Sequence, residues 1–232
     1  NEKILSIFED LEFKRLKENY FKIFKQQENQ PPRNNELNFE IENKNEENYL
    51  SQKLESEIGI RIMIDKVLSS KSVSIDYLIS EGNSYISFCL SSTISYYVNF
   101  NLKDISYTLN LFREIFESKI LKILYDHKYF LKILKANKIN IDDNFFDIKI
   151  ANYLVDSSRR DDLESILKLN INVEISENQI HTRVSYLKKT YELLFNSLKL
   201  NGLIDLFLQI EMPLSRILME MEFEGVKLDR SL

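Results

Sequence analysis

The sequence predicts an α/β fold in which a mixed β-sheet is flanked by helices. Residues 73–100 contain three closely spaced strand patterns, and helical and strand patterns alternate after them. The remainder of the chain is mostly helical in its apolar spacing. With 232 residues, 44% of them hydrophobic and 29% charged, the chain has the size of one globular domain with appendages.

The N-terminal part combines a helical pattern with a polar segment. Residues 1–25 place apolar side chains at helical spacing. Residues 26–57 are rich in Asn and Glu and contain Pro31-Pro32, a composition typical of a linker. Residues 58–68 fit two structures, because isoleucine at every second position favours a strand while the same segment also fits a helix face.

Four segments carry strand patterns. Val73–Leu78 is rich in β-forming residues, and Tyr85–Leu90 and Ile94–Phe100 alternate apolar and polar side chains. Because the connection Ser91–Thr93 is short, the last two are expected to form an antiparallel hairpin. Ile120–Tyr125 is predicted to be a buried strand. A strand joined to another through a helix can pair in parallel, so the sheet is expected to be mixed.

Helices are predicted in the rest of the chain. Asp104 is expected to be the N-cap of a helix that extends to Phe116. Further helical patterns cover 128–137, a short helix within 144–156, 161–169, 184–198 and 203–208. Pro213 begins a last helix, and Gly225 is expected to end it in the αL conformation. The buried stripe of this last helix is predicted to be Leu214, Ile217, Leu218 and Met221.

Composition excludes several classes of function. No apolar run approaches the roughly 18 residues of a membrane span, and the first residues do not resemble a signal peptide. One cysteine and two histidines exclude a disulfide framework and a thiolate zinc cluster, so any metal would be a hard cation held by carboxylates. The net charge of −5 predicts weak non-specific binding to nucleic acid.

The segment EMPLSRILMEMEFEGVKLD, residues 211–229, is less generic than its helical pattern alone. It resembles the junction between the 3′-5′ exonuclease and polymerase domains of bacterial family A DNA polymerases. Residues 1–16 resemble the end of the 5′-nuclease region of that family, and residues 125–156 resemble the central part of its exonuclease domain. The resemblance implies an RNase H-like (DnaQ-like exonuclease) fold.

The same resemblance implies the domain boundaries. Residues 1–25 would be the helical tail of the preceding 5′-nuclease region, and residues 26–57 the polar linker. Residues 58–210 would be the exonuclease-like domain, and residues 211–232 the start of the polymerase domain. The parent protein would be a DNA-directed DNA polymerase of replication and repair, and this segment, which lacks the polymerase palm and fingers, would not incorporate nucleotides.

Active members of the family use four carboxylates to hold two divalent cations. The resemblance places Asp76 at the first acid of the Asp-x-Glu motif, but Leu78 replaces the glutamate. Phe130 stands at the acid of the second motif, and Leu187 or Tyr186 at the acid of the third. Because apolar side chains cannot bind Mg²⁺, the sequence predicts a vestigial, catalytically inactive exonuclease domain without a metal of its own.

Two alternatives remain open at this stage. Nearby acids could replace the missing ligands and give an active metal-dependent 3′-5′ proofreading exonuclease. The acids considered are Asp126, Asp142, Asp143, Asp147 and Asp156. The chain could also be a non-enzymatic interaction module whose polymerase-like ending is a coincidence.

A basic segment is the other candidate site. Six lysines and one acid lie between Lys119 and Lys138, and Lys128, Lys132 and Lys135 share one helix face. The face could contact DNA phosphates, or it could be a solvated face that balances acidic neighbours, which is the more usual case.

The resemblance also implies the wider context. DNA would be bound through the parent polymerase, which would use Mg²⁺, and the domain would contact its own polymerase domain. A monomeric, cytoplasmic bacterial protein without membrane contact is expected.

Overall fold

The computed structural model describes residues 50–82, 84–91, 94–175 and 181–226. These residues belong to one compact unit, Glu46–Leu232. The helix predicted within residues 1–25, most of the predicted linker, and Asp229 lie outside the described residues.

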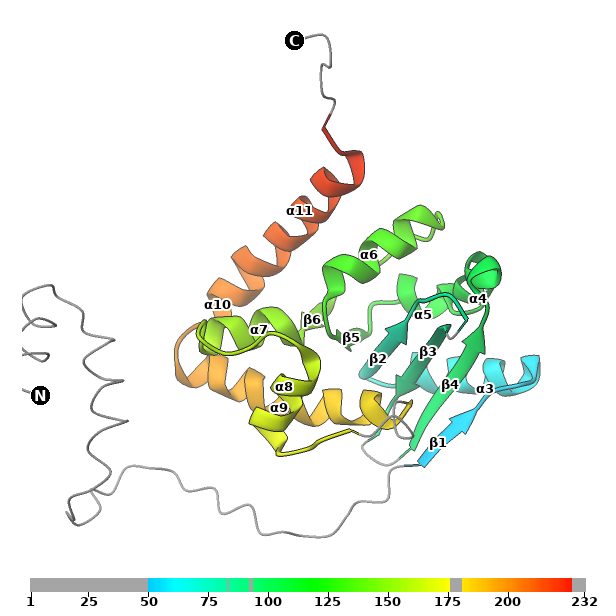
Figure 1. The fold of residues 1–232 in the computed structure, drawn as a ribbon, viewed down its shortest axis with the longest axis horizontal. Helices are drawn as coiled ribbons and strands as arrows, with labels where there is room; N and C mark the ends of the chain where they lie inside the picture. The colour runs from blue at the N-terminus through cyan, green and yellow to red at the C-terminus, as the bar shows by residue number, and fades with distance from the viewer. Residues whose placement is uncertain (1–49, 83, 92–93, 176–180, 227–232) are drawn as a thin grey trace, which may run out of the picture. The chain divides into compact units, whose positions relative to one another are not determined.

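A six-stranded mixed sheet forms the centre of this unit (Figure 1). Its strands lie in the order β1-β4-β3-β2-β5-β6. Their bounds are β1 Leu50–Lys53, β2 Ser72–Leu78, β3 Ser84–Cys89, β4 Ile94–Phe100, β5 Leu121–Leu124 and β6 Phe145–Asp147. β3 runs antiparallel to its two neighbours, β2 and β4. The other three pairings, β1 with β4, β2 with β5 and β5 with β6, are parallel.

Helices cover both faces of the sheet. Before β5 they are α3 Glu57–Leu68, the 3₁₀ turn η1 Leu102–Asp104, α4 Ile105–Leu111 and α5 Arg113–Glu117. After β5 they are α6 His127–Ala136, α7 Ile148–Val155, α8 Leu163–Ile171, α9 Arg183–Leu200, α10 Ile204–Leu206, the π-helical turn η3 Phe207–Glu211 and α11 Met212–Glu224.

Two hydrophobic clusters result from the alternation of side chains along the strands. Val73 and Ile75 of β2 belong to the cluster that includes residues of α3, α5 and α6. Ile123 of β5 and Phe146 of β6 belong to the second cluster, with residues of α7, α8 and α9. β2, β3 and β5 are therefore covered on both faces, and a charged residue on them, such as Asp76, lies in a buried environment.

The predicted mixed sheet is confirmed, including the antiparallel pairing of β3 with β4 and the buried strand at β5. The ambiguous segment 58–68 is helical, because Ser56 caps α3 and Ile60, Ile64 and Val67 share its buried face. The predicted helix from Ile105 to Phe116 is interrupted at Phe112, and the Asp104 side chain makes no capping hydrogen bond.

Two edge strands were not predicted. Leu50–Lys53 lies in the segment assigned to the linker, and Phe145–Asp147 lies in a segment assigned to a helix. β1 has four exposed residues, so its side chains carry no burial pattern, and β6 is too short for periodicity to appear. Both strands are held by backbone pairing to one neighbouring strand, β1 to β4 and β6 to β5.

The last helix differs from prediction in its exposed face. Pro213 lies in its first turn as predicted, but the predicted stripe of Leu214, Ile217, Leu218 and Met221 is 40–63% exposed. The buried residues of α11 are instead Ser215 and Met219. Gly225 has φ +73° and ψ −174°, so it ends the helix with positive φ, although its ψ is extended rather than αL.

Candidate functional site

The site centres on Asp76, near the carboxyl end of β2. Asp76 is 4% exposed, and β2 places it opposite Ser87 of β3. It borders a cavity of about 240 Å³, which is also lined by the two residues between β5 and α6, by the start of α8 and by the start of α9. The cavity is lined by Asp76, Tyr77, Tyr125, Asp126, Asp162, Leu163, Glu164 and Arg183.

The Asp76 carboxylate is fully engaged by protein groups. Arg183, the first residue of α9, donates from Nε to Oδ2 and from Nη2 to Oδ1, each at 2.9 Å. The hydroxyl of Tyr85 donates to Oδ2 at 3.0 Å, and Arg183 Nη2 lies 3.2 Å from the same hydroxyl. A two-pronged guanidinium contact of this kind is the strongest common way to neutralise a buried carboxylate.

The electrostatics of this cluster favour its present arrangement. Burial, and next the negative charge of Asp76, raise the pKa of Tyr85, so its phenol stays a hydrogen-bond donor. Arg183 is itself largely buried, yet the adjacent Asp76 raises its pKa above the ordinary value, so the guanidinium stays charged. Its Nη1 also lies 3.3 Å from Glu164, which is mostly exposed. The guanidinium thus supplies the positive charge next to Asp76.

Of the apolar replacements at the other motif positions, Phe130 and Leu187 belong to the two hydrophobic clusters. Leu78 ends β2 and is partly buried opposite Tyr85. Phe130 of α6 is fully buried, with its ring 4.7 Å from that of Tyr77 and 5.5 Å from that of Phe116. Phe130 therefore contributes to the packing of the first cluster and offers no oxygen ligand.

The third motif position gives the same result. Leu187 of α9 is fully buried in the second cluster, and the neighbouring Tyr186 is partly buried against it. Either register of the resemblance therefore places a hydrophobic or aromatic side chain where a carboxylate would be needed.

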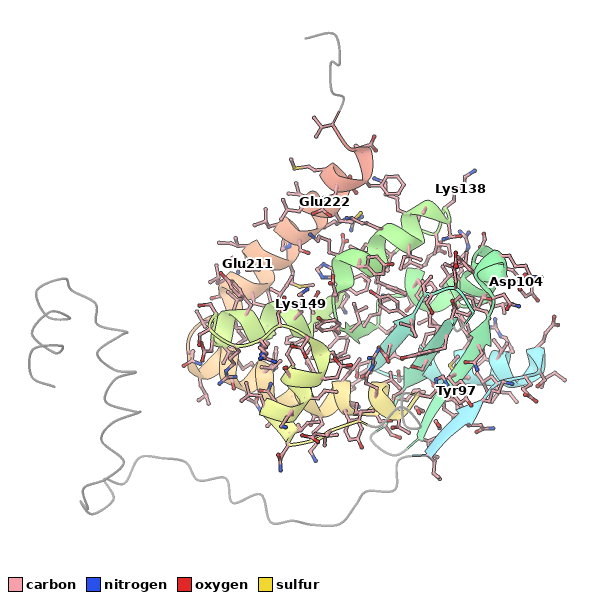
Figure 2. The ribbon with its side chains drawn as sticks, in the orientation of Figure 1. Tyr97, Asp104, Lys138, Lys149, Glu211 and Glu222 are labelled. Carbon is pink, nitrogen blue, oxygen red and sulfur yellow. The ribbon has the colours of Figure 1, made fainter. Side chains whose placement is uncertain are left out.

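The nearby acids considered as substitutes all have other partners. Asp126 caps α6 and lies 3.3 Å from Lys149, which is labelled in Figure 2. Asp147 accepts from the backbone and ring of His127. The remaining three, Asp142, Asp143 and Asp156, pair with Lys122, Arg216 and Arg159. Within the part of the chain that the structure describes, no group of three or more His, Cys, Asp or Glu side chains could hold a metal. The residues present therefore do not fit the two cations of an active exonuclease.

The basic face predicted on α6 exists, but it has a protein partner. Lys128 and Lys132 both bind the carboxylate of Glu222 on α11, with Lys128 Nζ 2.7 Å from Oε1. Lys135 lies 3.8 Å from Glu224 and over the ring of Phe223. The three lysines are grouped as predicted, and their neighbour is the last helix.

Two interactions, one at the site and one near it, were not predicted from the sequence. The resemblance points to acids in the segment that contains Arg183, although a cation at the start of the long helix is visible in the sequence. The pair of His127 and Asp147, at 2.6 Å and both 2% exposed, joins residues 20 positions apart. Burial by itself would raise the pKa of Asp147, but the hydrogen bonds and charge of His127, with a backbone hydrogen bond from Lys149, lower it overall.

Two relatives found by comparison with known proteins are both bacterial DNA polymerase I proteins. The chain is 26% identical to DNA polymerase I of Borreliella burgdorferi, over 99% of this chain and 30% of that protein. It is 34% identical to DNA polymerase I of Caldicellulosiruptor bescii, over 52% of this chain and 15% of that protein. The chain is related to the exonuclease-like region of bacterial family A DNA polymerases. It spans less than a third of the length of these relatives.

Solved structures agree on the fold. The POL domain of Pol1 from M. smegmatis, in complex with DNA primer-template and dNTP, aligns with a TM-score of 0.63 and 14% identity, over 76% of this chain and 33% of that one. Escherichia coli RNase D, an exoribonuclease, aligns with a TM-score of 0.58 and 12% identity, over 77% of this chain and 52% of that one. The fold is therefore the α/β RNase H-like fold of DnaQ-like exonucleases. No family model matches the sequence.

Among the helices that the structure describes, no single one is long and apolar enough to cross a membrane. One pair of consecutive segments is long and apolar enough when taken together, but a bend of 116° separates its two parts, Arg183–Leu200 and Ile204–Glu224.

Proposed function

We propose that this region is a catalytically inactive 3′-5′ exonuclease-like domain of a bacterial DNA polymerase I. The observation that carries the proposal is the ion pair between Arg183 and Asp76. In a two-metal mechanism the carboxylates hold dications about 4 Å apart, and these stabilise the attacking and leaving oxygens. Here the remaining carboxylate already holds a cationic side chain, so it is not available as a metal ligand.

Restoring the reaction would require more than displacing the arginine. Three further acids are missing, and two of their replacements, Phe130 and Leu187, are fully buried. A carboxylate placed at either position would lose its hydration without gaining a charge partner, which is strongly unfavourable. The packing of the domain thus supports a structural role in place of catalysis.

The last helix supports a scaffolding role. Ile210 of η3 and Leu214, Ile217 and Met221 of α11 follow one another at helical spacing and are 42–63% exposed. Together with Leu218 we call them the α11 stripe. The curated relatives are much longer than this chain, and their additional length provides a polymerase region that could cover the stripe. We propose that the occupant is the polymerase domain of the same protein.

The remaining functions belong to the parent protein. We propose that it is a monomeric, cytoplasmic DNA-directed DNA polymerase of replication and repair. In this proposal the polymerase domain binds Mg²⁺ and DNA, and the exonuclease-like domain supports it without a metal of its own.

The test of inactivity is hydrolysis of a 5′-labelled single-stranded DNA by the chain with Mg²⁺ or Mn²⁺. An Asp76→Ala variant measures any contaminating nuclease, because a contaminant does not respond to the substitution. We expect no shortened products above buffer from either protein. Trimming that the Asp76→Ala variant lacks would refute the proposal and favour an active exonuclease with rearranged carboxylates.

A further inference from the structure

The lysines of α6 are held by acids of α11 that lie 89–94 positions later in the sequence. α6 and α11 lie side by side, and Glu222 faces α6 from the C-terminal half of α11 (Figures 1 and 2). The side-chain carboxylate of Glu222 bridges Lys128 and Lys132, which lie one turn apart on α6. The next lysine of the row, Lys135, faces Glu224. We call Lys128, Lys132 and Lys135 the α6 lysine row.

The geometry of this contact is that of an oxyanion between two ammonium groups. The two lysines, acting mainly through side-chain hydrogen bonds, lower the pKa of Glu222 to about 2, so its carboxylate is ionised at neutral pH. A DNA phosphate is likewise an anion with two unesterified oxygens, and ammonium groups bind it as point charges. The row therefore presents the same donors to Glu222 as it would present to a phosphate.

Beyond Met219, the end of α11 is fastened to α6 by these ion pairs and by the contact of Lys135 with the Phe223 ring. The buried residues of α11 are Ser215 and Met219, and both precede Glu222. From residue 220 to residue 226 every residue is exposed. The lysine side chains keep 32–36% of their surface exposed, and Glu222 keeps 42%. Ion pairs this exposed contribute less than about a tenfold change to an equilibrium, so a polyanion can compete with them.

We propose that the α6 lysine row contacts the phosphate backbone of single-stranded DNA, and that Glu222 and Glu224 occupy the row when DNA is absent. DNA and the end of α11 then compete for the same three ammonium groups. Because α11 carries the α11 stripe, release of Glu222 and Glu224 from the row would also change the position of that stripe. The inference rests on the proposed function only for the choice of DNA as the polyanion.

The experiment measures binding of a fluorescein-labelled oligothymidylate by anisotropy in EDTA. The variant Glu222→Gln/Glu224→Gln frees the row. The control Glu192→Gln/Glu220→Gln removes the same two charges from exposed positions of α9 and α11. We expect the first variant to bind with a Kd about threefold to tenfold lower than the control. Its plot of log affinity against log salt should be steeper by about 1 to 2, because each added phosphate contact on a single strand contributes about 0.7.

Further substitutions make the outcome decisive. Adding Lys128→Gln and Lys132→Gln to the Glu222→Gln/Glu224→Gln variant should abolish the gain, while circular dichroism verifies that each variant is folded. Equal affinity of the two charge-matched variants would overturn the proposal and would assign the row to helix packing alone. EDTA excludes metal-dependent trimming, so this result is independent of the nuclease assay that tests the proposed function.

Discussion

Arg183 and Asp76 lie 107 positions apart in the sequence, and the fold brings the guanidinium within 2.9 Å of both carboxylate oxygens. The side chains are only 15% and 5% exposed. This pair gives the buried carboxylate of Asp76 a positive charge from within the protein itself. Removal of one partner would leave the other buried and unpaired, which is the costly case for ion pairs.

The first prediction concerns this pair. Arg183→Ala should lower the free energy of unfolding by about 3 kcal/mol, because Asp76 would remain buried with only Tyr85 as donor. Urea denaturation measures the change, with Arg160→Ala on an exposed loop as the matched control. The double variant Asp76→Asn/Arg183→Met should recover most of the loss. If the double variant is as unstable as Arg183→Ala, burial of an unpaired charge is not the cause.

The second prediction concerns Phe130. Restoring the acid of the second motif by Phe130→Asp should destabilise the domain by at least about 3–5 kcal/mol, since the side chain is fully buried between Tyr77 and Phe116. Thermal and urea unfolding would show it. Tyr107→Asp, at a position 62% exposed on α4, should change stability by less than about 0.5 kcal/mol. A stable Phe130→Asp variant would mean that this position opens to solvent.

The third prediction concerns pH. Lys122 is fully buried on β5, and burial lowers its pKa to about 8, although Asp142 partly opposes the shift. Between about pH 8 and pH 10 the unfolded chain therefore binds more protons at this residue than the folded chain does. Stability contributed by this residue should then rise with pH, by about 2 kcal/mol between pH 7 and pH 9.5.

The matched variant for this prediction is Lys122→Met. The buried Cys89, Tyr77 and Tyr85 have raised pKa values and oppose the trend at high pH, but they are present in both proteins. The measurement is therefore the difference in unfolding free energy between wild type and Lys122→Met at pH 7, 8, 9 and 9.5. A difference that does not change with pH would show that Lys122 is not desolvated in the folded state.

The fourth prediction separates the two sides of α11. Met219→Ala should cost about 2–3 kcal/mol, because Met219 is 4% exposed in the first core cluster. Ile217→Lys/Met221→Lys should change stability by less than about 1 kcal/mol, because both side chains are more than half exposed. In a longer chain that includes the proposed polymerase domain, the same double substitution should destabilise the protein if the α11 stripe is covered there. No effect in the parent would argue against that occupant.

The sequence predicted the central strands and most helices because their side chains are half or fully buried and therefore periodic. The hairpin of Tyr85–Leu90 with Ile94–Phe100 is an example. It did not predict β1, whose side chains are all exposed, nor the three-residue β6. For the last helix, apolar spacing predicted a buried stripe, yet the structure buries Met219 and leaves that stripe exposed. Periodicity reports which residues could be covered, and not whether this chain covers them.

The candidate site shows the same division. The sequence by itself determined which residues stand at the positions that the resemblance points to: Leu78, Phe130, and Leu187 or Tyr186, none of which carries a carboxylate. Only the tertiary structure decided that Arg183 neutralises Asp76 and that Glu222 occupies the lysine row. Such pairings depend on the distance between charges from separate elements, and that distance is set by how helices pack on the sheet rather than by local spacing.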